Sequence, residues 1–187
     1  MTHKIHLKTK LFIHENREMN KKLLIREIEI TELKILEDML YESIYQPDET
    51  RLISREILDD PKIRVYIDKF GQKKDDHCLV ADINGQIVGA VWVRILSGEI
   101  KGYGNIDDKT PEFAISLFKE YRNQGIGSLL MKNMISYLEK SGYKQTSLSV
   151  QKENYAFKMY QNFGFRIISE NEEDYLMLLK LKDTDKL

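Results

Sequence analysis

Apolar residues in the first part of the chain follow a strand pattern and then a helix pattern. Residues Lys22 to Ile30 alternate between apolar and polar side chains, which predicts a strand. Apolar side chains then recur at helical spacing from Leu33 to Leu40, and Thr31 is placed to cap this helix. The segment from Asp48 to Phe70 contains prolines and is expected to be irregular, with short helical pieces.

The clearest local pattern is a pair of apolar runs separated by Asn84-Gly85. The runs span Leu79 to Ile83 and Gln86 to Leu96. Asn-Gly between two such runs is typical of a two-residue hairpin, because both turn residues need a positive φ. We therefore expect an antiparallel hairpin here.

The second half of the chain predicts strands that alternate with helices. After a polar loop over residues 97–111, strands are expected at 112–118, 145–150, 164–168 and 175–181, and helices at 125–140 and 154–163. Gly142 is the usual kind of residue just past a helix. A hairpin followed by strand-helix-strand units indicates an α/β chain, with a central mixed and mostly antiparallel sheet flanked by helices.

Composition narrows the classes of function. The chain has 187 residues, with 29 Lys and Arg against 30 Asp and Glu, and this length is typical of one globular domain. Cys78 is the only cysteine, which excludes an intramolecular disulfide and fits a reducing compartment, so a cytoplasmic protein is expected. A net charge of −1 is not typical of proteins that bind nucleic acid or anionic membranes.

Neither a membrane span nor a metal site is expected. The longest apolar run, Ile87 to Val93, is far shorter than the ~20 residues of a membrane helix. The four histidines lack the spacing of metal ligands and are expected at the surface. Residues 1 to 22 carry six Lys or Arg against two Asp or Glu. We interpret residues 1–21 as a basic N-terminal arm and residues 22–187 as one domain.

The segment that carries chemistry is Arg122-Asn123-Gln124-Gly125-Ile126-Gly127-Ser128, between an expected strand and an expected helix. Glycines let the backbone approach a ligand, and unpaired N–H groups at a helix N-terminus favour an anion such as pyrophosphate. A P-loop would require a Gly-Lys-Ser/Thr string, which the chain lacks. A dinucleotide fingerprint would require a third glycine where Leu130 stands, so neither of these two loops fits.

The pattern Arg122-x-x-Gly125-x-Gly127 resembles the Arg/Gln-x-x-Gly-x-Gly/Ala signature of the GNAT superfamily of N-acetyltransferases. About twenty-six residues after Gly127, Asn154-x-Ala156-x-x-x-Tyr160-x-x-x-Gly164-Phe165 resembles a second element of this family. The two motifs together are specific. The resemblance extends over roughly residues 22 to 182.

The resemblance implies a GNAT-like acyl-CoA N-acyltransferase fold and binding of acetyl-CoA. In such folds the strands that correspond to residues 112–118 and 145–150 splay apart, and the pantetheine arm inserts between them. The first of these strands would pair with the arm, and the loop N–H groups would hold the pyrophosphate. The cofactor-binding residues that this implies are Ile115, Ser116, Leu117, Arg122, Asn123, Gln124, Gly125, Ile126, Gly127, Ser128 and Asn154.

Acetyl transfer to an amine needs a neutral amine, a hydrogen-bond donor for the oxyanion and a departing thiolate that is protonated or tolerated. The resemblance implies a backbone N–H near Leu117 as the oxyanion donor and Tyr160 as the acid for the thiolate. An unperturbed Tyr has a pKa of about 10 and a thiol has a pKa of about 8.5. Tyr160 would therefore need a hydrogen bond or a perturbed pKa to protonate the thiolate.

Glu112 is the candidate general base, because some family members place a catalytic carboxylate on the strand that it begins. The Glu that other members carry on the strand before the Asn helix is absent, since that strand reads Leu148-Ser149-Val150. The loop carboxylates Glu99, Asp107 and Asp108 are alternatives that could bind a cationic amine. The amine could also lose its proton to water. Aromatic residues of the irregular segment would wall the acceptor site or pack in the core: Tyr41, Tyr45, Tyr66 and Phe70.

Two functions remain open at this point. The first is an N-acetyltransferase that moves acetyl from acetyl-CoA to a primary amine of a small molecule or peptide, by direct attack in a ternary complex. The alternative is a non-catalytic acyl-CoA sensor or interaction module with the same fold. Family members often pair through their C-terminal strands, here Tyr175 to Leu181, so the resemblance also implies a homodimer as one oligomeric state.

Overall fold

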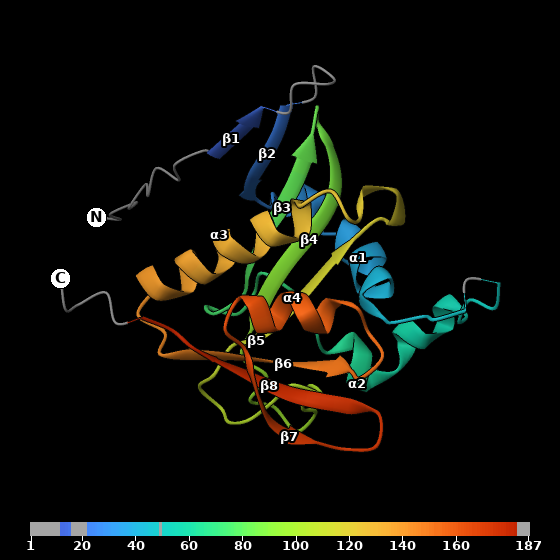
Figure 1. Cartoon of the computed structure of the whole chain (residues 1–187), viewed down its shortest axis with the longest axis vertical. Coiled ribbons are helices and arrows are strands. Elements are labelled where there is room, and N and C mark those ends of the chain that lie inside the picture. The colour runs from blue at the N-terminus through green and yellow to red at the C-terminus, as the bar shows by residue number, and fades with distance from the viewer. Residues whose placement is uncertain (1–11, 16–21, 49, 183–187) are drawn as a thin grey trace.

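The structure is a computed structural model that describes residues 12–15, 22–48 and 50–182. Within these residues eight strands form one sheet in the order β1-β2-β3-β4-β5-β6-β8-β7 (Figure 1). Every neighbouring pair is antiparallel except β5 and β6, which are parallel, so the predicted mixed sheet is confirmed. The strands are β1 (Phe12–Glu15), β2 (Lys22–Glu27), β3 (His77–Ile83), β4 (Gln86–Arg94), β5 (Glu112–Leu117), β6 (Gln145–Gln151), β7 (Arg166–Glu170) and β8 (Asp174–Lys180).

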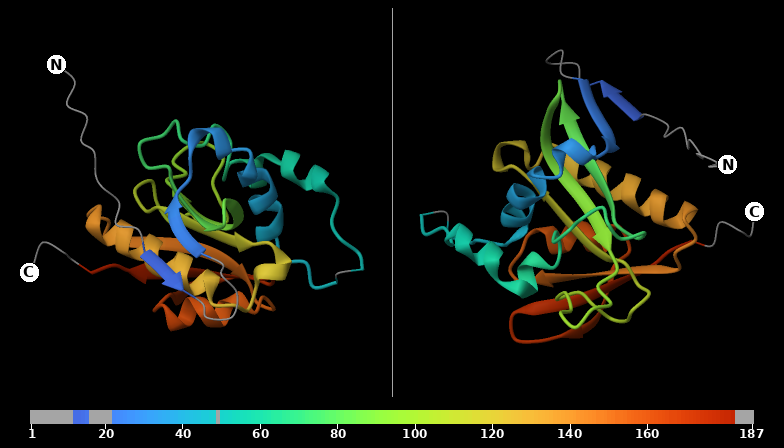
Figure 2. Two further views of the ribbon diagram at one scale, coloured as in Figure 1. Left: turned by 90° about the horizontal axis from the view of Figure 1, so that it is seen from above. Right: turned by 180° about the vertical axis from the view of Figure 1, so that it is seen from behind.

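Helices cover both faces of the sheet. Figures 1 and 2 show α3 and α4 on one face and α1 on the other. Strand β4 serves both sides, because Val91 and Val93 pack in the core under α3, whereas Ala90 and Trp92 pack in the core under α1. The helices are α1 (Ile35–Ser43), α2 (Pro61–Arg64), α3 (Ile126–Lys140) and α4 (Ala156–Asn162), with 3-10 turns η1 (Ile30–Glu32), η2 (Arg55–Asp59) and η3 (Lys119–Tyr121).

The predicted hairpin is confirmed. Strands β3 and β4 are joined by Asn84 and Gly85, whose φ values of 55° and 87° are both positive. The Gly85 N–H donates to a carboxylate oxygen of Asp82 at 2.6 Å, which closes the turn. The hairpin forms the middle of the sheet, between β2 and β5.

Strands β5 and β6 run apart, as the family resemblance implies. They pair at a single position, Glu112 with Ser147, and the Ser147 N–H donates to the Pro111 carbonyl at 3.1 Å. Figure 1 shows the two strands diverging beyond this point. The β5 edge that faces away from β4 is therefore open after Glu112, and this opening positions the functional cleft.

The predicted cap of α1 is wrong. Thr31 lies inside η1, and α1 begins only at Ile35. The Glu32 carboxylate accepts from the Glu29 N–H at 2.9 Å and so caps η1, whereas α1 follows Lys34 with no side-chain cap among the described residues. Both oxygens of that carboxylate also accept from Arg26 at 2.7 Å, which holds it in place.

The expected surface position of the histidines is wrong for His77. Its ring stacks on Tyr137 with 3.4 Å between the centroids, and its Nε2 is buried without a partner within the described ranges. Burial lowers the pKa of His77 to about 4, so the ring is neutral at physiological pH. His3 and His6 lie outside the described residues.

The edge strands of the sheet are β1 and β7. Most of the expected N-terminal arm is outside the described residues, but residues 12–15 form β1, which pairs antiparallel with β2. Strand β8 is hydrogen-bonded to β6 on one side and β7 on the other, so its own edges are occupied. In the described ranges no helix is long and apolar enough to cross a membrane.

Candidate active site

A cleft of about 640 Å³ lies where β5 and β6 diverge. Its walls come from the end of α1, from Ile115 to Leu117 of β5, from the loop that precedes α3 and from the start of α4. Five residues of the segment expected to bind the cofactor line it directly: Arg122, Asn123, Gly125, Gly127 and Ser128. The structure thus brings the two sequence motifs together on opposite sides of one opening.

The loop before α3 presents unpaired main-chain donors. Asn123 and Gly125 have φ values of 59° and 79°, and this left-handed backbone turns the chain into the helix. The first N–H of α3 with a partner belongs to Leu129, which donates to the Gly125 carbonyl at 3.1 Å. The backbone N–H groups from Asn123 to Ser128 have no partner in the described part of the chain. Together with the dipole of a 15-residue helix they suit an anion such as a diphosphate.

Gly127 allows close packing at the same place. A Cβ at Gly127 would lie 3.3 Å from Cδ1 of Leu117 and 3.6 Å from Sδ of Met159. The first turn of α3 therefore approaches both the end of β5 and helix α4. A larger residue would push this turn away from the cleft.

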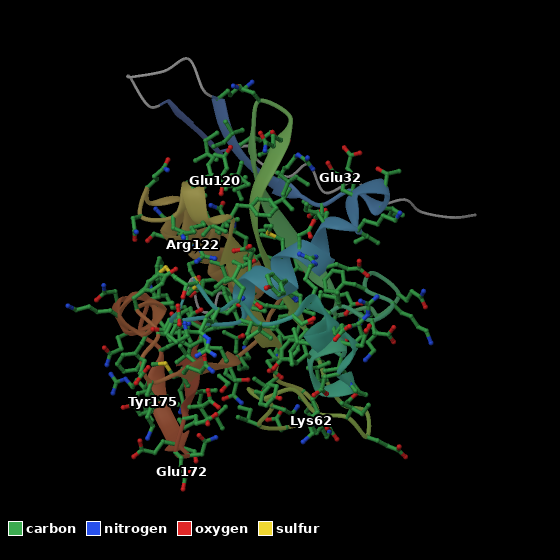
Figure 3. The ribbon with its side chains drawn as sticks, turned by 90° about the vertical axis from the view of Figure 1, so that its right-hand side faces the viewer. Glu32, Lys62, Glu120, Arg122, Glu172 and Tyr175 are labelled. Carbon is green, nitrogen blue, oxygen red and sulfur yellow. The ribbon has the colours of Figure 1, made fainter. Side chains whose placement is uncertain are left out.

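The side chain of Arg122 braces the loop. Its Nε donates to the Leu117 carbonyl at 3.0 Å, and its Nη2 contacts the Glu42 carboxylate at 2.6 Å. Figure 3 shows Arg122 beside Glu120 near the first turn of α3. Gln124 is similarly occupied, because its amide donates to the Glu120 carbonyl at 2.8 Å. These side chains shape the loop, and the free donors belong to the main chain.

Ser116 points away from the cleft. Its hydroxyl is buried and donates to the Met39 carbonyl of α1 at 2.6 Å. Only the backbone of Ser116 can contribute to binding. This fits the expectation that the open edge of β5 pairs with the cofactor through main-chain groups.

A second cavity, of about 290 Å³, adjoins the first, and Glu112 lies in its wall. Glu112 is only 2% exposed. One carboxylate oxygen accepts from the Gly104 N–H at 2.7 Å and from the Tyr66 hydroxyl. Burial raises the pKa of Glu112 to about 7, against the opposing effect of these two hydrogen bonds. The other oxygen, Oε2, is buried and has no partner in the ranges that the structure describes.

Two glycines let the loop over residues 97–111 close onto this carboxylate. A side chain at Gly102 would collide with the Glu112 carboxylate, and a Cβ at Gly104 would lie 2.8 Å from the backbone of Leu148. Tyr66 completes the enclosure, because its oxygen accepts from the Tyr103 N–H at 2.7 Å.

Tyr160 and Asn154 lie where the two cavities meet, since both residues line both cavities. The Tyr160 ring is buried against Phe165, with 5.9 Å between centroids. Its hydroxyl has no hydrogen-bond partner among the described residues, and burial raises the pKa of Tyr160 well above its ordinary value. The Asn154 side chain accepts from the Ala156 N–H at 2.9 Å and thereby holds the start of α4.

The alternative loop carboxylates lie elsewhere. Asp107 accepts from the N–H groups of Lys109 and Thr110 at 2.8 and 2.7 Å, Asp108 pairs with Lys101, and Glu99 lines a separate groove. None of the three lines the second cavity.

Some residues of the second cavity were predicted and others were not. Tyr45 and Tyr66 line it as expected, whereas Phe70 packs in the core. The sequence reasoning missed Tyr103, Glu173 and Asp174, which also line this cavity. Glycines on either side of Tyr103 were a usable signal for close packing, but no local pattern marks Glu173 or Asp174.

Comparisons with known proteins identify a family and similar sequences. The family model described as "Acetyltransferase (GNAT) family" matches residues 38–165. "Probable N-acetyltransferase san" of Drosophila melanogaster is 30% identical over 100 residues, which is 51% of this chain and 50% of that protein. The match thus spans only about half of the fly protein.

Solved structures share the fold. An acetyltransferase of the GNAT family from Streptococcus pneumoniae superposes with a TM-score of 0.61 at 25% identity, covering 86% of this chain and 99% of that one. The PaiA N-acetyltransferase of Thermoplasma acidophilum, crystallised with coenzyme A, has a TM-score of 0.57 at 22% identity and covers 84% and 98%.

Proposed function

Because the chain belongs to the acetyltransferase (GNAT) family, we propose that it transfers acetyl from acetyl-CoA to a primary amine of a small molecule or peptide. The amine attacks directly while both substrates are bound. One observation carries the proposal: Tyr160 lies where a cleft with free main-chain donors meets a cavity with a buried carboxylate. The Thermoplasma relative crystallised with coenzyme A supports the choice of cosubstrate.

The residues present fit this cosubstrate. The N–H groups from Asn123 to Ser128 would hold its diphosphate, and the open edge of β5 would receive the pantetheine arm. When bound, acetyl-CoA supplies the acetyl group as a thioester. Asn154 and Tyr160 lie at the end of the cleft that adjoins the second cavity.

Glu112 is the proposed general base. With a pKa raised to about 7, its carboxylate is partly deprotonated at neutral pH and can still hold a proton taken from the amine. Its Oε2 is the free oxygen for this proton, because Oε1 already accepts from Tyr66 and Gly104. An acceptor that arrives as an ammonium first loses one proton to water. As the N–C bond forms and the C–S bond breaks, the second proton of the now neutral amine passes to Glu112, which later releases it to solvent.

Tyr160 stabilises the departing sulfur. Burial raises the pKa of its hydroxyl, which makes Tyr160 a weaker acid than the thiol of coenzyme A. It therefore donates a hydrogen bond to the thiolate without complete proton transfer, and the thiolate takes its proton from water. This role differs from that of the acid predicted from the sequence.

Calorimetric titration with acetyl-CoA, followed by a thiol-release screen over diamines, aminoglycosides, amino acids and N-terminal peptides, tests the proposal. We expect binding and amine-dependent release of free thiol. Binding without release by any amine would contradict the transferase and favour the acyl-CoA sensor. Absence of binding would contradict both functions, because both depend on the loop before α3.

A further inference from the structure

The second cavity is lined by acidic side chains without a cation among them. Its charged lining residues are Glu112, Glu173 and Asp174, and no Lys or Arg of the described chain lines it. Glu173 and Asp174 come from the turn between β7 and β8 and the first residue of β8, whereas Glu112 begins β5. Figure 3 shows this hairpin, marked by Glu172 and Tyr175, across the lower part of the molecule from Lys62 of α2.

Several other carboxylates in the molecule contact cations directly. Glu42 pairs with Arg122 at 2.6 Å, and Asp76 pairs with Arg94 at 3.0 Å. Lys152, which follows the cavity residue Gln151, is engaged elsewhere, because its ammonium contacts Glu170 at 2.8 Å and lies over the Tyr175 ring. Neither Glu173 nor Asp174 has an ion-pair partner in the described ranges, so their charge is uncompensated.

Buried acceptor atoms in the same wall also lack donors. Oε2 of Glu112, on a side chain 2% exposed, and Oε1 of Gln151 are both buried without partners among the described residues. Both residues line the cavity. A buried acceptor without a donor is costly, so these oxygens suit a guest with several N–H donors.

The acidic groups occupy two separate positions. Glu112 is paired with Ser147 of β6, and Asp174 is paired with Gln151 of the same strand. At about 3.3 Å per residue, these two points are roughly 13 Å apart along β6. An ammonium seated at Glu112 therefore leaves a second anionic position, at Asp174 and Glu173, to be filled.

We infer that the acceptor carries two cationic nitrogens, the reacting amine at Glu112 and a second cation held by Asp174 and Glu173. This inference rests on the proposed function and specifies its substrate class. A free α,ω-diamine and a short peptide with Lys at its second position share this chemistry. The second cation determines which acceptors bind and takes no part in the reaction.

Pairs of acceptors that match in length and differ by one positive charge test the inference. 1,8-Diaminooctane is compared with octylamine, and a peptide with Lys at its second position is compared with the same peptide carrying norleucine there. We expect kcat/KM to favour the dication about fivefold or more in at least one pair. Equal values in both pairs, with thiol release intact, would overturn the inference and leave the proposed function standing.

The variant Asp174→Asn tests whether the preference for a dication depends on Asp174. We expect it to remove most of the preference for the dication. Glu172→Gln is the matched control, because it removes one negative charge from the same turn at a residue that does not line the cavity. A preference that survives Asp174→Asn, or that falls equally in both variants, would overturn the inference.

Titration of 1,8-diaminooctane onto the protein with coenzyme A bound gives a readout without turnover. Binding that weakens in Asp174→Asn but not in Glu172→Gln would support the inference even if no amine released thiol. In that case only the proposed function would fail. Equal binding to wild type and Asp174→Asn would count against the inference, whatever the rates.

Discussion

The two halves of the cleft are built from different kinds of sequence. The cofactor half depends on one continuous segment, from Leu117 to Ser128, and offers main-chain N–H groups. The acceptor half is assembled from separate parts of the chain and offers the side-chain oxygens of Tyr66, Glu112 and Asp174. The first half presents donors suited to an anion, and the second presents acceptors suited to a cation.

Because of this difference, substitutions in the cofactor half and in the acceptor half should have different effects. Main-chain donors depend on the backbone path, so side chains matter there where they would alter the packing, as at Gly127, or add charge beside the donors, as at Gly125. The acceptor half depends on side-chain identity, so single substitutions there can change the substrate while the fold stays the same. Mutations should therefore separate binding of the cosubstrate from choice and reaction of the amine.

The largest effect is expected from Gly125→Asp. Gly125 has a φ of 79° and nothing within 4 Å of its Cβ position, so the new side chain fits sterically but places a carboxylate beside the free N–H groups. Repulsion of a diphosphate should weaken acetyl-CoA binding by about 100-fold or more, measured by calorimetry.

Gly142→Asp is the matched control for that variant. Gly142 follows the other end of α3, also has a φ of 79° and also has open space around its Cβ position. The two variants therefore carry similar backbone strain of about 1–2 kcal/mol. Equal loss of affinity in both would mean that strain, and not charge at the loop, disturbs binding.

Features that depend on one short segment could be predicted from the sequence, whereas features that depend on distant segments could not. Local turn chemistry predicted the β3–β4 hairpin from Asn84-Gly85, and the glycines before α3 predicted an anion loop with free donors. In both cases a short stretch determines the backbone by itself. The divergence of β5 and β6 and the choice of Tyr160 came from the family resemblance, which carries long-range information that local patterns lack.

The misses share a physical cause, which is contact between segments far apart in the chain. Thr31 does not cap α1 because it lies within η1, whose capping residue Glu32 is held by Arg26 on β2. His77 is enclosed because Tyr137 of α3 stacks on it. Asp174 belongs to the acceptor cavity only because β8 lies beside β6. Periodicity and turn signals contain no information on such contacts.

Glu112→Gln should have the next largest effect, on the acceptor half alone. Loss of the proton-accepting carboxylate should lower kcat by about 100-fold, while acetyl-CoA affinity stays within about twofold of wild type. In wild type kcat/KM should rise with pH and level off above about 7, where Glu112 is deprotonated. The variant should lack this rise, and an unchanged pH profile would remove Glu112 from the role of base.

The pH dependence of the free energy of unfolding gives an independent measure of the Glu112 pKa. The pKa of Glu112 is raised from 4.5 to about 7 on folding, so the folded state favours the protonated carboxyl. Its contribution to the free energy of unfolding should be fully present below pH 4.5 and be lost as the pH rises through about 7. Urea unfolding of wild type should show this fall relative to Glu112→Gln, and parallel pH curves would contradict the raised pKa.

Tyr160→Phe should act at the junction of the halves. Because the Tyr160 hydroxyl has no partner in the described residues, its removal should leave stability and acetyl-CoA affinity nearly unchanged. Loss of a hydrogen bond to the departing thiolate should lower kcat by about tenfold. Tyr155→Phe, at an exposed residue that lines only the cofactor cleft, is the control. An equal change in both variants would contradict a specific role for Tyr160.

The smallest effect, and the most specific, is expected from Tyr66→Phe. The hydrogen bond from Tyr66 lowers the pKa of Glu112, so its removal should raise that pKa and move the rise of kcat/KM to higher pH. A hydrogen bond contributes about 0.5–1.5 kcal/mol, so activity at pH 7 should fall about 2- to 10-fold and recover at alkaline pH. Tyr45→Phe, at a residue that lines the same cavity, should leave the inflection in place. A loss of activity that is equal at every pH would mean that Tyr66 only packs against the cavity, because packing alone does not shift the titration of the carboxylate.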